Sequence, residues 1–257
     1  MTASVFLAEP AILAVAAPDT LVAIDGPEAR HAVSVVRMQP GEPIELVDGA
    51  GRRVRGVVES IRGSDHLEVR VGEVLDEAPP ALRLVVVQAL PKGDHGELAV
   101  DLMTQVGVDE IVPWGAQRSV AQWKSDRIEK SRSKWQAAAT QAAKQSRRAR
   151  IPVIAPLATT AGVCARVGEA ALAIVLHEEA EHHLAGIPLP ASGEVLLITG
   201  PEGGLSDTER QALRDAGARE ALLGPTVLRS SLAGAVAVTV VSARAHWNDP
   251  GMEGSAT

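Results

Sequence analysis

From residue 82 onward, short apolar segments alternate with segments of helical character. Leu82–Leu90 is a continuous apolar run, as expected for a strand that is buried on both faces. Alternation of this kind predicts an α/β domain with a parallel sheet covered by helices on both sides. The further predicted strands are Glu110–Trp114, Ile151–Ala155, Ala171–Leu176, Glu194–Thr199 and Glu220–Leu223. The predicted helices are Gly96–Val106, Ser125–Arg150, Gly162–Gly168, Ser206–Ala216 and Ser230–Trp247.

The preceding part of the chain consists of short β-prone runs separated by Gly- and Pro-containing turns. Asp48–Gly49 is a hairpin signal, and Ala29–Met38 is predicted as one short helix. Together these features predict a small β-barrel of about 75 residues. The predicted strands are Leu21–Ile24, Pro43–Val47, Arg53–Ile61 and His66–Val74. Because Asp76–Pro80 has the composition of a linker, we expect a β-barrel over residues 1–77, an α/β domain over 81–249 and a flexible tail at 250–257.

Composition excludes several classes of protein. A hydrophobic content of 46% is too high for a disordered chain, and no apolar run reaches the ~18 residues of a membrane span. The apolar start, Met1–Ala17, lacks a basic region and is interpreted as mature protein rather than a signal peptide. The single cysteine, Cys164, excludes an internal disulfide framework and fits a reducing cytoplasm. We therefore expect a cytoplasmic protein without a membrane partner.

The net charge is −7, but its distribution is uneven. Residues 117–150 contain ten basic and two acidic residues, a local charge of +8. Such a stripe on an acidic protein is typical of a surface that binds a polyanion, although a solvated helix face explains the charges equally well. With no Tyr, one Phe and four Trp, the chain does not favour recognition by stacking of bases on aromatic side chains.

A glycine-rich turn, Gly200–Gly204, directly follows a predicted strand and precedes a capping box formed by Ser206 and Glu209. Such a turn at the carboxyl end of a parallel strand lets a ligand approach the backbone, although a tight strand–helix connection explains it as well. The spacing matches neither a dinucleotide fingerprint nor a Walker loop, and Glu202 would repel a pyrophosphate. A neutral or cationic ligand is therefore favoured.

A second Gly/Pro turn, Leu223–Pro225, follows the next predicted strand, so that the two turns are expected to form one pocket floor. Arg229 stands at the start of the following helix, where a cation is electrostatically disfavoured. We interpret Arg229 as a side chain that binds an anionic substrate. The alternative is an exposed arginine without a functional role. The run His177–His183 lacks the spacing of a zinc motif, and we expect a loop there and no metal.

These features form an ordered set of motifs. They are Pro91–Asp94, Gln105–Pro113, Arg118–Val120, Gly200–Leu205, Leu223–Pro225 and Val227–Arg229, preceded by Arg30–His31, Val36–Arg37, Gly41 and Asp48–Gly51. The chain resembles the bacterial 16S rRNA (uracil-N3) methyltransferases (RsmE type) of the SPOUT superfamily. The resemblance implies a PUA-like RNA-binding β-barrel, a deep trefoil knot in the α/β domain, S-adenosyl-L-methionine (AdoMet) as cofactor, 16S rRNA or the small ribosomal subunit as substrate, and a homodimer. The alternation of strands and helices by itself predicts only an ordinary doubly wound sheet.

The resemblance also implies roles for individual residues. Arg229, or Arg118 of the partner subunit, would stabilise negative charge on the uracil oxygens, and Glu202 is either a general base or a residue that shapes its loop. The family usually has arginine at Thr226 and an acidic residue at Ser231. The implied cofactor-binding residues are Leu176, Thr199, Gly200, Pro201, Gly203, Leu223, Gly224, Pro225, Leu228, Ser230 and Ala233. The implied RNA-binding residues are Arg30, His31, Arg37, Lys92, Arg118, Lys124, Arg127, Lys144, Arg147 and Arg148.

Three alternatives remain at this point. The first is a related knotted methyltransferase that acts on tRNA or on a ribose 2′-OH. The second is a non-catalytic RNA-binding module in ribosome assembly. The third, a nicotinamide-dependent oxidoreductase, is disfavoured because the dinucleotide fingerprint is absent from the sequence.

Overall fold

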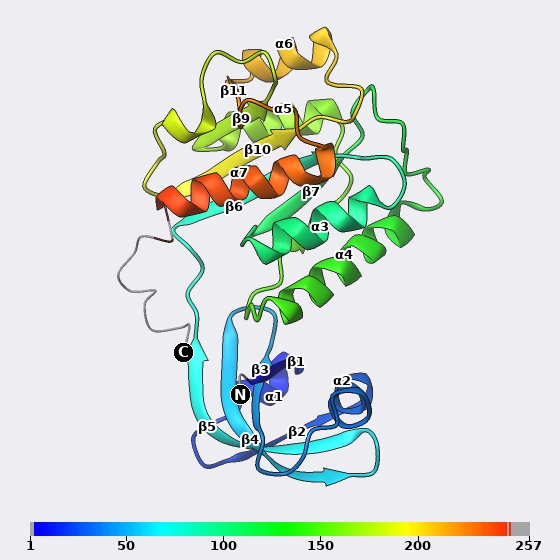
Figure 1. Ribbon diagram of the computed structural model, residues 1–257, viewed down its shortest axis with the longest axis vertical. Coiled ribbons are helices and arrows are strands. Elements are labelled where there is room, and N and C mark those ends of the chain that lie inside the picture. Colours follow the sequence, from blue (N-terminus) through cyan, green and yellow to red (C-terminus); the bar gives the residue numbers. More distant parts are fainter. Residues whose placement is uncertain (1–2, 246, 248–257) are drawn as a thin grey trace. The chain divides into compact units, whose positions relative to one another are not determined.

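The computed structural model describes residues 3–245 and 247 of the chain (Figure 1). The chain divides into two compact units. The first contains the residues up to Pro79 together with Ala143–Ile151, and the second contains Pro80–Ala142 and the residues from Pro152 onward. The predicted linker at Asp76–Pro80 lies next to this division, and the domain bounds stay a prediction. The return of Ala143–Ile151 to the first unit is not part of that prediction. The predicted tail at 250–257 lies outside the described residues.

The first unit is built on a five-stranded sheet with the strand order β1-β3-β4-β5-β2. Strand β1 pairs with β3 in parallel, and the other neighbours are antiparallel. Register shifts within the β4–β5 pair mark bulges, which bend long strands. The strands are β1 (Ser4–Leu7), β2 (Leu21–Asp25), β3 (Pro43–Val47), β4 (Arg52–Arg62) and β5 (His66–Asp76). The four predicted strands are confirmed, whereas β1 and the short helix α1 (Pro10–Ala14) are additions.

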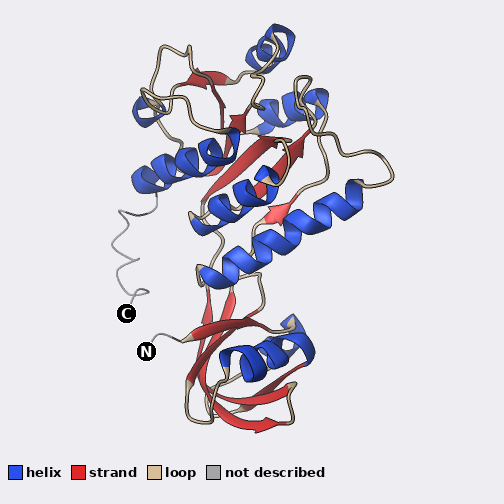
Figure 2. Ribbon diagram, turned by 45° about the vertical axis from the view of Figure 1, so that its right-hand side comes forward, coloured by secondary structure: helices blue, strands red, loops and turns tan. Residues whose placement is uncertain are grey.

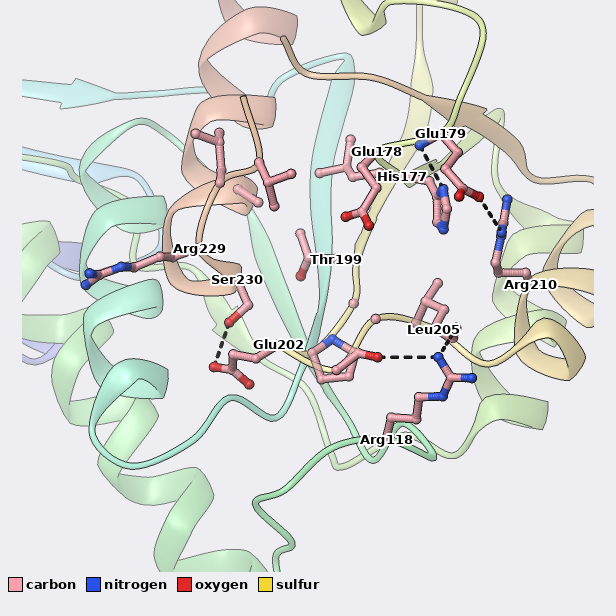
Figure 3. A pocket seen from close by; sticks show the side chains of 18 of the residues that line it. Arg118, His177, Glu178, Glu179, Thr199, Glu202, Leu205, Arg210, Arg229 and Ser230 are labelled. Carbon is pink, nitrogen blue, oxygen red and sulfur yellow. Dashed lines mark hydrogen bonds and ion pairs between the residues drawn. The ribbon is translucent and has the colours of Figure 1, made fainter. Parts of the chain in front are cut away.

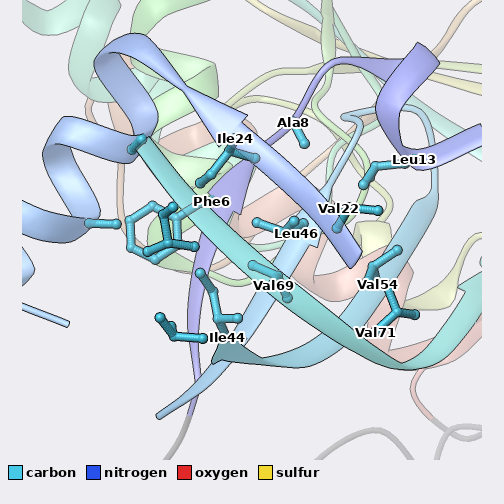
Figure 4. Close-up of a cluster of buried hydrophobic side chains, with 14 of the residues drawn as sticks. Phe6, Ala8, Leu13, Val22, Ile24, Ile44, Leu46, Val54, Val69 and Val71 are labelled. Carbon is cyan, nitrogen blue, oxygen red and sulfur yellow. The ribbon is translucent and has the colours of Figure 1, made fainter. Parts of the chain in front are cut away.

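The core of this unit is formed by apolar side chains from all five strands and from α1 (Figure 4). Phe6, Leu13 and Leu46 are almost completely buried in it. A smaller cluster joins Val5 and Val47 to Ala149 from the returning segment. Burial of Val5 and Phe6 stabilises β1, a strand of only four residues.

The predicted helix over Ala29–Met38 is wrong in detail. The structure has α2 (Gly26–Arg30), which continues into a π-helix (His31–Val36) and ends where Arg37 adopts a left-handed φ of 62°. π-Helical turns are rare in proteins, and those that occur often lie at functional sites. Sequence periodicity does not distinguish such a turn from an α-helix.

The predicted helix over Ser125–Arg150 is too long. Helix α4 runs from Ile128 to Gln145. The chain then turns at Arg147, whose φ is 57°. Within the first unit, Ile151 N donates to Gly49 O at 3.0 Å, and Arg53 Nη2 donates to Arg147 O at 2.9 Å. These long-range bonds end the helix.

The second unit contains a parallel six-stranded sheet with the order β11-β9-β10-β6-β7-β8. The predicted α/β architecture is confirmed. The strands are β6 (Leu82–Ala89), β7 (Glu110–Trp114), β8 (Val153–Ile154), β9 (Leu172–Leu176), β10 (Gly193–Thr199) and β11 (Arg219–Ala221). The remaining helices are α3 (His95–Gln105), α5 (Thr160–Glu169), a 3-10 turn (Leu184–Gly186), α6 (Asp207–Asp215) and α7 (Ser230–Ala245).

Helices cover this sheet on both faces (Figure 2). Val85 and Val87 of β6 pack into one cluster with Val163 of α5 and Leu213 of α6. On the other face α7 packs against α3, β6 and β10. The strand order does not decide how the chain threads, so the trefoil knot stays a prediction. Among the described residues, no helix is both long and apolar enough to cross a membrane.

Candidate active site

A cavity of 630 Å³ lies where the parallel strands of the second unit end (Figure 3). All parallel strands end at one edge of the sheet, so the loops after β7, β9 and β10 meet there with the segment that leads into α7. A second cavity of 140 Å³ shares Leu176, Leu228 and Ala233 with the first. The larger volume falls within the range of about 300–1,000 Å³ that is typical of ligand sites.

All of the predicted cofactor residues line one of these two cavities. Eight line the larger one, namely Leu176, Thr199, Gly200, Pro201, Gly203, Leu228, Ser230 and Ala233. The smaller one is lined by Leu223, Gly224 and Pro225, with Leu176, Leu228 and Ala233 in the shared wall. The structure thus brings the two predicted turns together, while the role of each residue in cofactor binding stays a prediction.

The turn Gly200–Gly204 has the conformation that its glycines favour. A Cβ at Gly200 would lie 3.2 Å from the Leu205 side chain, and Gly204 has a φ of 69°. The predicted capping box is confirmed, since Ser206 and Glu209 bond reciprocally at the start of α6. The turn is therefore held at both ends, by β10 and by the capped helix.

Glu202 bonds to two other segments at this edge. Its Oε1 accepts a hydrogen bond from Lys92 N at 3.3 Å and another from Ser230 Oγ at 3.0 Å. Partial burial alone would raise the pKa of Glu202, but hydrogen bonds from its own N–H, from Ser230 and from Lys92 lower the pKa below its ordinary value. A carboxylate with a lowered pKa is a weak general base near neutral pH.

The two arginines of the predicted catalytic set differ in their contacts. Arg118, in the loop after β7, donates from Nη1 to Leu205 O at 3.2 Å and to Gly203 O at 3.4 Å, so within its own chain it binds the glycine turn. Arg229 is exposed and precedes α7. Within residues 3–245 its guanidinium has no hydrogen bond or ion pair, and it extends away from Thr199 (Figure 3). Arg229 is thus available to a bound substrate.

Comparison with known proteins identifies the family. Residues 78–242 match the family described as RNA methyltransferase domain, and residues 24–72 match the RNA methyltransferase PUA domain. A protein of Mycobacterium tuberculosis named ribosomal RNA small subunit methyltransferase E is 44% identical over 230 residues, which are 87% of each chain. The chain belongs to the ribosomal RNA small subunit methyltransferase E family. The Bacillus subtilis relative of that name is 28% identical over 227 residues, 85% of this chain and 88% of the relative.

Solved structures agree with this assignment. A methyltransferase from Legionella pneumophila, whose structure contains the bound cofactor SAM, is 25% identical and superimposes with a TM-score of 0.80. The match covers 95% of this chain and 98% of that one. The resemblance seen in the sequence motifs is thereby confirmed for the fold and the family.

The loop predicted over His177–His183 is confirmed, and its first three residues line the methyltransferase cavity. Arg210 of α6, which carries no motif signal of its own, also lines the cavity. Arg210 pairs with Glu220 at 3.0 Å and with Glu179 at 3.5 Å. Arg210 follows Ser206, the N-cap of α6, by four residues. This spacing is the one signal in the sequence that could have placed Arg210 at this edge of the sheet. No group of three or more His, Cys, Asp or Glu side chains suited to a metal occurs among the described residues.

The predicted RNA-binding residues are divided between the two units. Lys92, Arg118, Lys124 and Arg127 are exposed in the second unit. The first unit contains Arg30, His31, Arg37, Lys144, Arg147 and Arg148.

Lys144, one of the residues predicted to bind RNA, is engaged within the first unit instead. Its Nζ lies 2.8 Å from both carboxylate oxygens of Glu28, its side chain is 11% exposed, and it stands over the Phe6 ring. A paired and largely buried ammonium is not available to a phosphate. We therefore assign Lys144 to the packing of the first unit.

Proposed function

We propose that this protein is an AdoMet-dependent methyltransferase that methylates N3 of a specific uridine in the 16S rRNA of the small ribosomal subunit. The observation that carries the proposal is the pair of adjoining cavities at the carboxyl ends of β9, β10 and β11, lined by every residue predicted to bind the cofactor. Membership in the methyltransferase E family and the SAM-bound Legionella relative support it.

The residues present fit AdoMet. Leu176 and Leu228 offer apolar walls to an adenine ring, and the backbone of residues 222–228 offers polar groups to its edge. Carboxylates of Glu178, Glu179 and Asp207 at the larger cavity suit a ligand with a cationic sulfonium. Bound there, AdoMet supplies an electrophilic methyl group.

The protein then has to position uracil and stabilise the charge that appears when N3 loses its proton. That charge spreads onto O2 and O4, and the unpaired guanidinium of Arg229 is the group best suited to stabilise it. Glu202 and Arg118 already bind the protein's own groups. We assign no general base.

RNA binding is proposed for both units. The first unit would contribute through its PUA-like sheet and the exposed residues Arg30, His31 and Arg37, and the second through Lys92, Lys124 and Arg127. Phosphate contacts of this kind hold an RNA in register, while the base that enters the cavity is selected there.

We also propose, as the resemblance implies, that the protein is a homodimer and is located in the cytoplasm. The packed helices α3 and α7 carry the apolar side chains Leu98 and Leu232, which are 46% and 40% exposed. A second copy of the chain would remove such side chains from water.

The decisive experiment uses small ribosomal subunits that lack the modification. The protein is incubated with these subunits and AdoMet carrying a labelled methyl group, and the labelled nucleoside is identified and mapped. N3-methyluridine at one position in 16S rRNA is expected. A 2′-O-methyl product, or label in tRNA instead, would reassign the substrate. Calorimetry that detects no AdoMet binding would indicate a non-catalytic RNA-binding module.

A further inference from the structure

We propose that Glu202 is a positioning residue, which joins the loop before α3 and the start of α7 to the glycine turn, and that it is not the general base. The inference rests on the proposed methyl transfer and assigns a role within the same site. It concerns how the site holds Arg229, which lines the larger cavity, and the exposed loop that contains Lys92.

One oxygen of Glu202 connects three segments that are far apart in the sequence. The glycine turn follows β10, Lys92 follows β6, and Ser230 opens α7 after β11. Lys92 N and Ser230 Oγ both donate to Oε1, at 3.3 Å and 3.0 Å (Figure 3 shows the bond to Ser230). Loss of this carboxylate would leave both donors without their acceptor.

The bond to Ser230 fixes the position of Arg229. The backbone carbonyl of Arg229 accepts hydrogen bonds from Leu232 N and Ala233 N, at 2.9 Å and 3.0 Å, so Arg229 directly precedes α7 and is bonded to its first turn. A helix held at Ser230 therefore presents Arg229 from a fixed backbone. Within residues 3–245 no hydrogen bond or ion pair orients the side chain of Arg229, so its position depends on its backbone.

Electrostatics favour a charged Glu202 in this place. Helix α3 begins at His95, three residues after Lys92, and α7 begins at Ser230. Helix N-termini stabilise negative charge, so one carboxylate near both starts is favourable and offsets the cation at Arg229. A carboxylate whose charged form is stabilised by such contacts has little tendency to accept a proton from uracil.

Three variants test the assignment. Glu202→Gln keeps a carbonyl oxygen able to accept from Lys92 N and Ser230 Oγ, whereas Glu202→Ala removes the acceptor and Ser230→Ala removes one donor. A positioning role predicts that Glu202→Gln retains kcat within about threefold, while Glu202→Ala loses at least tenfold. At saturating AdoMet, the double variant Glu202→Ala/Ser230→Ala should lose no more kcat than Glu202→Ala alone, since both changes break the same bond.

A readout independent of activity accompanies the kinetics. Hydrogen exchange at the Lys92 amide should accelerate in Glu202→Ala and remain near the wild-type rate in Glu202→Gln. The acidic limb of the pH–rate profile should be unchanged in Glu202→Gln. Glu181→Gln, a change on the loop after β9 outside both cavities, is the matched control.

A general base makes the opposite prediction. Replacement of the base by Gln should reduce kcat by about 10²–10⁴-fold and remove the corresponding limb of the pH profile. Equal inactivity of Glu202→Gln and Glu202→Ala, with AdoMet binding and thermal melting intact in both, overturns the positioning role. Failure of the proposed function is distinct, because the wild-type protein itself would then transfer no methyl group to the small subunit.

Discussion

At the residue scale, three charged side chains surround the glycine turn and differ in what they bind. Arg118 donates to the carbonyls of the turn, and Glu202 accepts from the two neighbouring segments. Arg229 alone of the three binds no protein group within residues 3–245. The first two side chains are therefore bonded to other groups of this chain, and Arg229 is the one that we propose to contact the substrate.

This difference predicts the effect of Arg229→Ala. Methyl transfer should fall by about 10²–10³-fold, because a cation that stabilises the developing charge is removed. AdoMet affinity, measured by calorimetry, should change less than about twofold, which corresponds to ~0.4 kcal/mol. Arg219→Ala, at an exposed arginine of β11, serves as a control for loss of positive charge in the same unit. Equal losses in transfer and in AdoMet binding would indicate a binding or folding role instead.

At the element scale, α3 and α4 are held together by a close contact between Gly96 and Trp135. A Cβ at Gly96 would lie 2.8 Å from atoms of the Trp135 indole, and Trp123 packs edge-on against that ring at 5.1 Å. This contact fixes the position of α3, which begins shortly after the loop that contains Lys92.

Gly96→Ala should therefore destabilise the protein. Overpacking against a ring that is enclosed by its neighbours costs about 1–3 kcal/mol, measurable as a reduced free energy of unfolding in urea. Gly168→Ala in α5 is the matched control, because a Cβ there meets nothing within 4 Å. The control should be neutral or stabilising by up to ~1 kcal/mol. Equal effects of the two substitutions would contradict the packing argument.

A second feature at this scale is an ion-pair cluster at the opposite ends of the strands. Arg166 of α5 bonds to Glu110 at 2.6 Å and to Glu194 at 2.8 Å, which ties the starts of β7 and β10 to the helix. Burial by itself would raise the pKa of Glu110, but Arg166 and the more exposed Arg83 outweigh it, and the pKa is lowered.

Arg166→Met is expected to cost about 3 kcal/mol at pH 7, because two largely buried carboxylates lose their partner. Since the folded protein lowers the pKa of Glu110, the stabilisation is complete above the ordinary carboxyl range and is lost as the pH falls through the lowered pKa. The difference in free energy of unfolding between Arg166→Met and the wild type, measured in urea, should therefore become smaller below about pH 4. Arg83→Met, at a side chain that is 45% exposed, should cost at most ~1 kcal/mol. A pH-independent difference would disprove the electrostatic account.

At the scale of the whole molecule, an acidic protein is proposed to bind a polyanion through local groups of basic residues. Most arginines of the first-unit sheet pair with carboxylates, as Arg70 does with Glu59 at 2.7 Å and Arg62 with Glu68 at 3.3 Å. The exposed Lys92 and Lys124 of the second unit make no ion pair among the described residues and are better placed for phosphates. Arg127 lies 3.7 Å from the neighbouring Asp126, but both side chains of this pair are exposed. RNA affinity should then depend on a few specific contacts.

The affinity for a 16S rRNA fragment should consequently fall steeply with salt. A plot of log K against log salt is expected to be linear, and each of Lys92→Ala, Lys124→Ala and Arg127→Ala should reduce its slope by roughly 0.7–1. Lys144→Ala should leave the slope unchanged and reduce stability, since this lysine is paired with Glu28. A flat salt dependence would refute the proposed phosphate contacts.

The sequence by itself determined the strands and helices of the second unit, apart from the ends of α4, and the edge of the sheet at which the site lies. Apolar strands and capped helices are local patterns of sequence. Parallel strands bring the loops at their carboxyl ends to one edge of the sheet, so the turns at Gly200 and Leu223 could be placed around one site from the sequence alone. The ordered motifs of a known family supplied the chemistry and the residues that line the cavity.

Only the tertiary structure decided which charged groups are free. The bonds of Glu202 to Lys92 and Ser230, and the ion pair of Lys144 with Glu28, join residues about 30 to 120 positions apart, and no local pattern specifies such partners. The same holds for the return of Ala143–Ile151 to the first unit, which ends α4 early. Hydrogen-bonding capacity is a property of a residue type, whereas its use depends on which donors and acceptors the fold brings within about 3 Å.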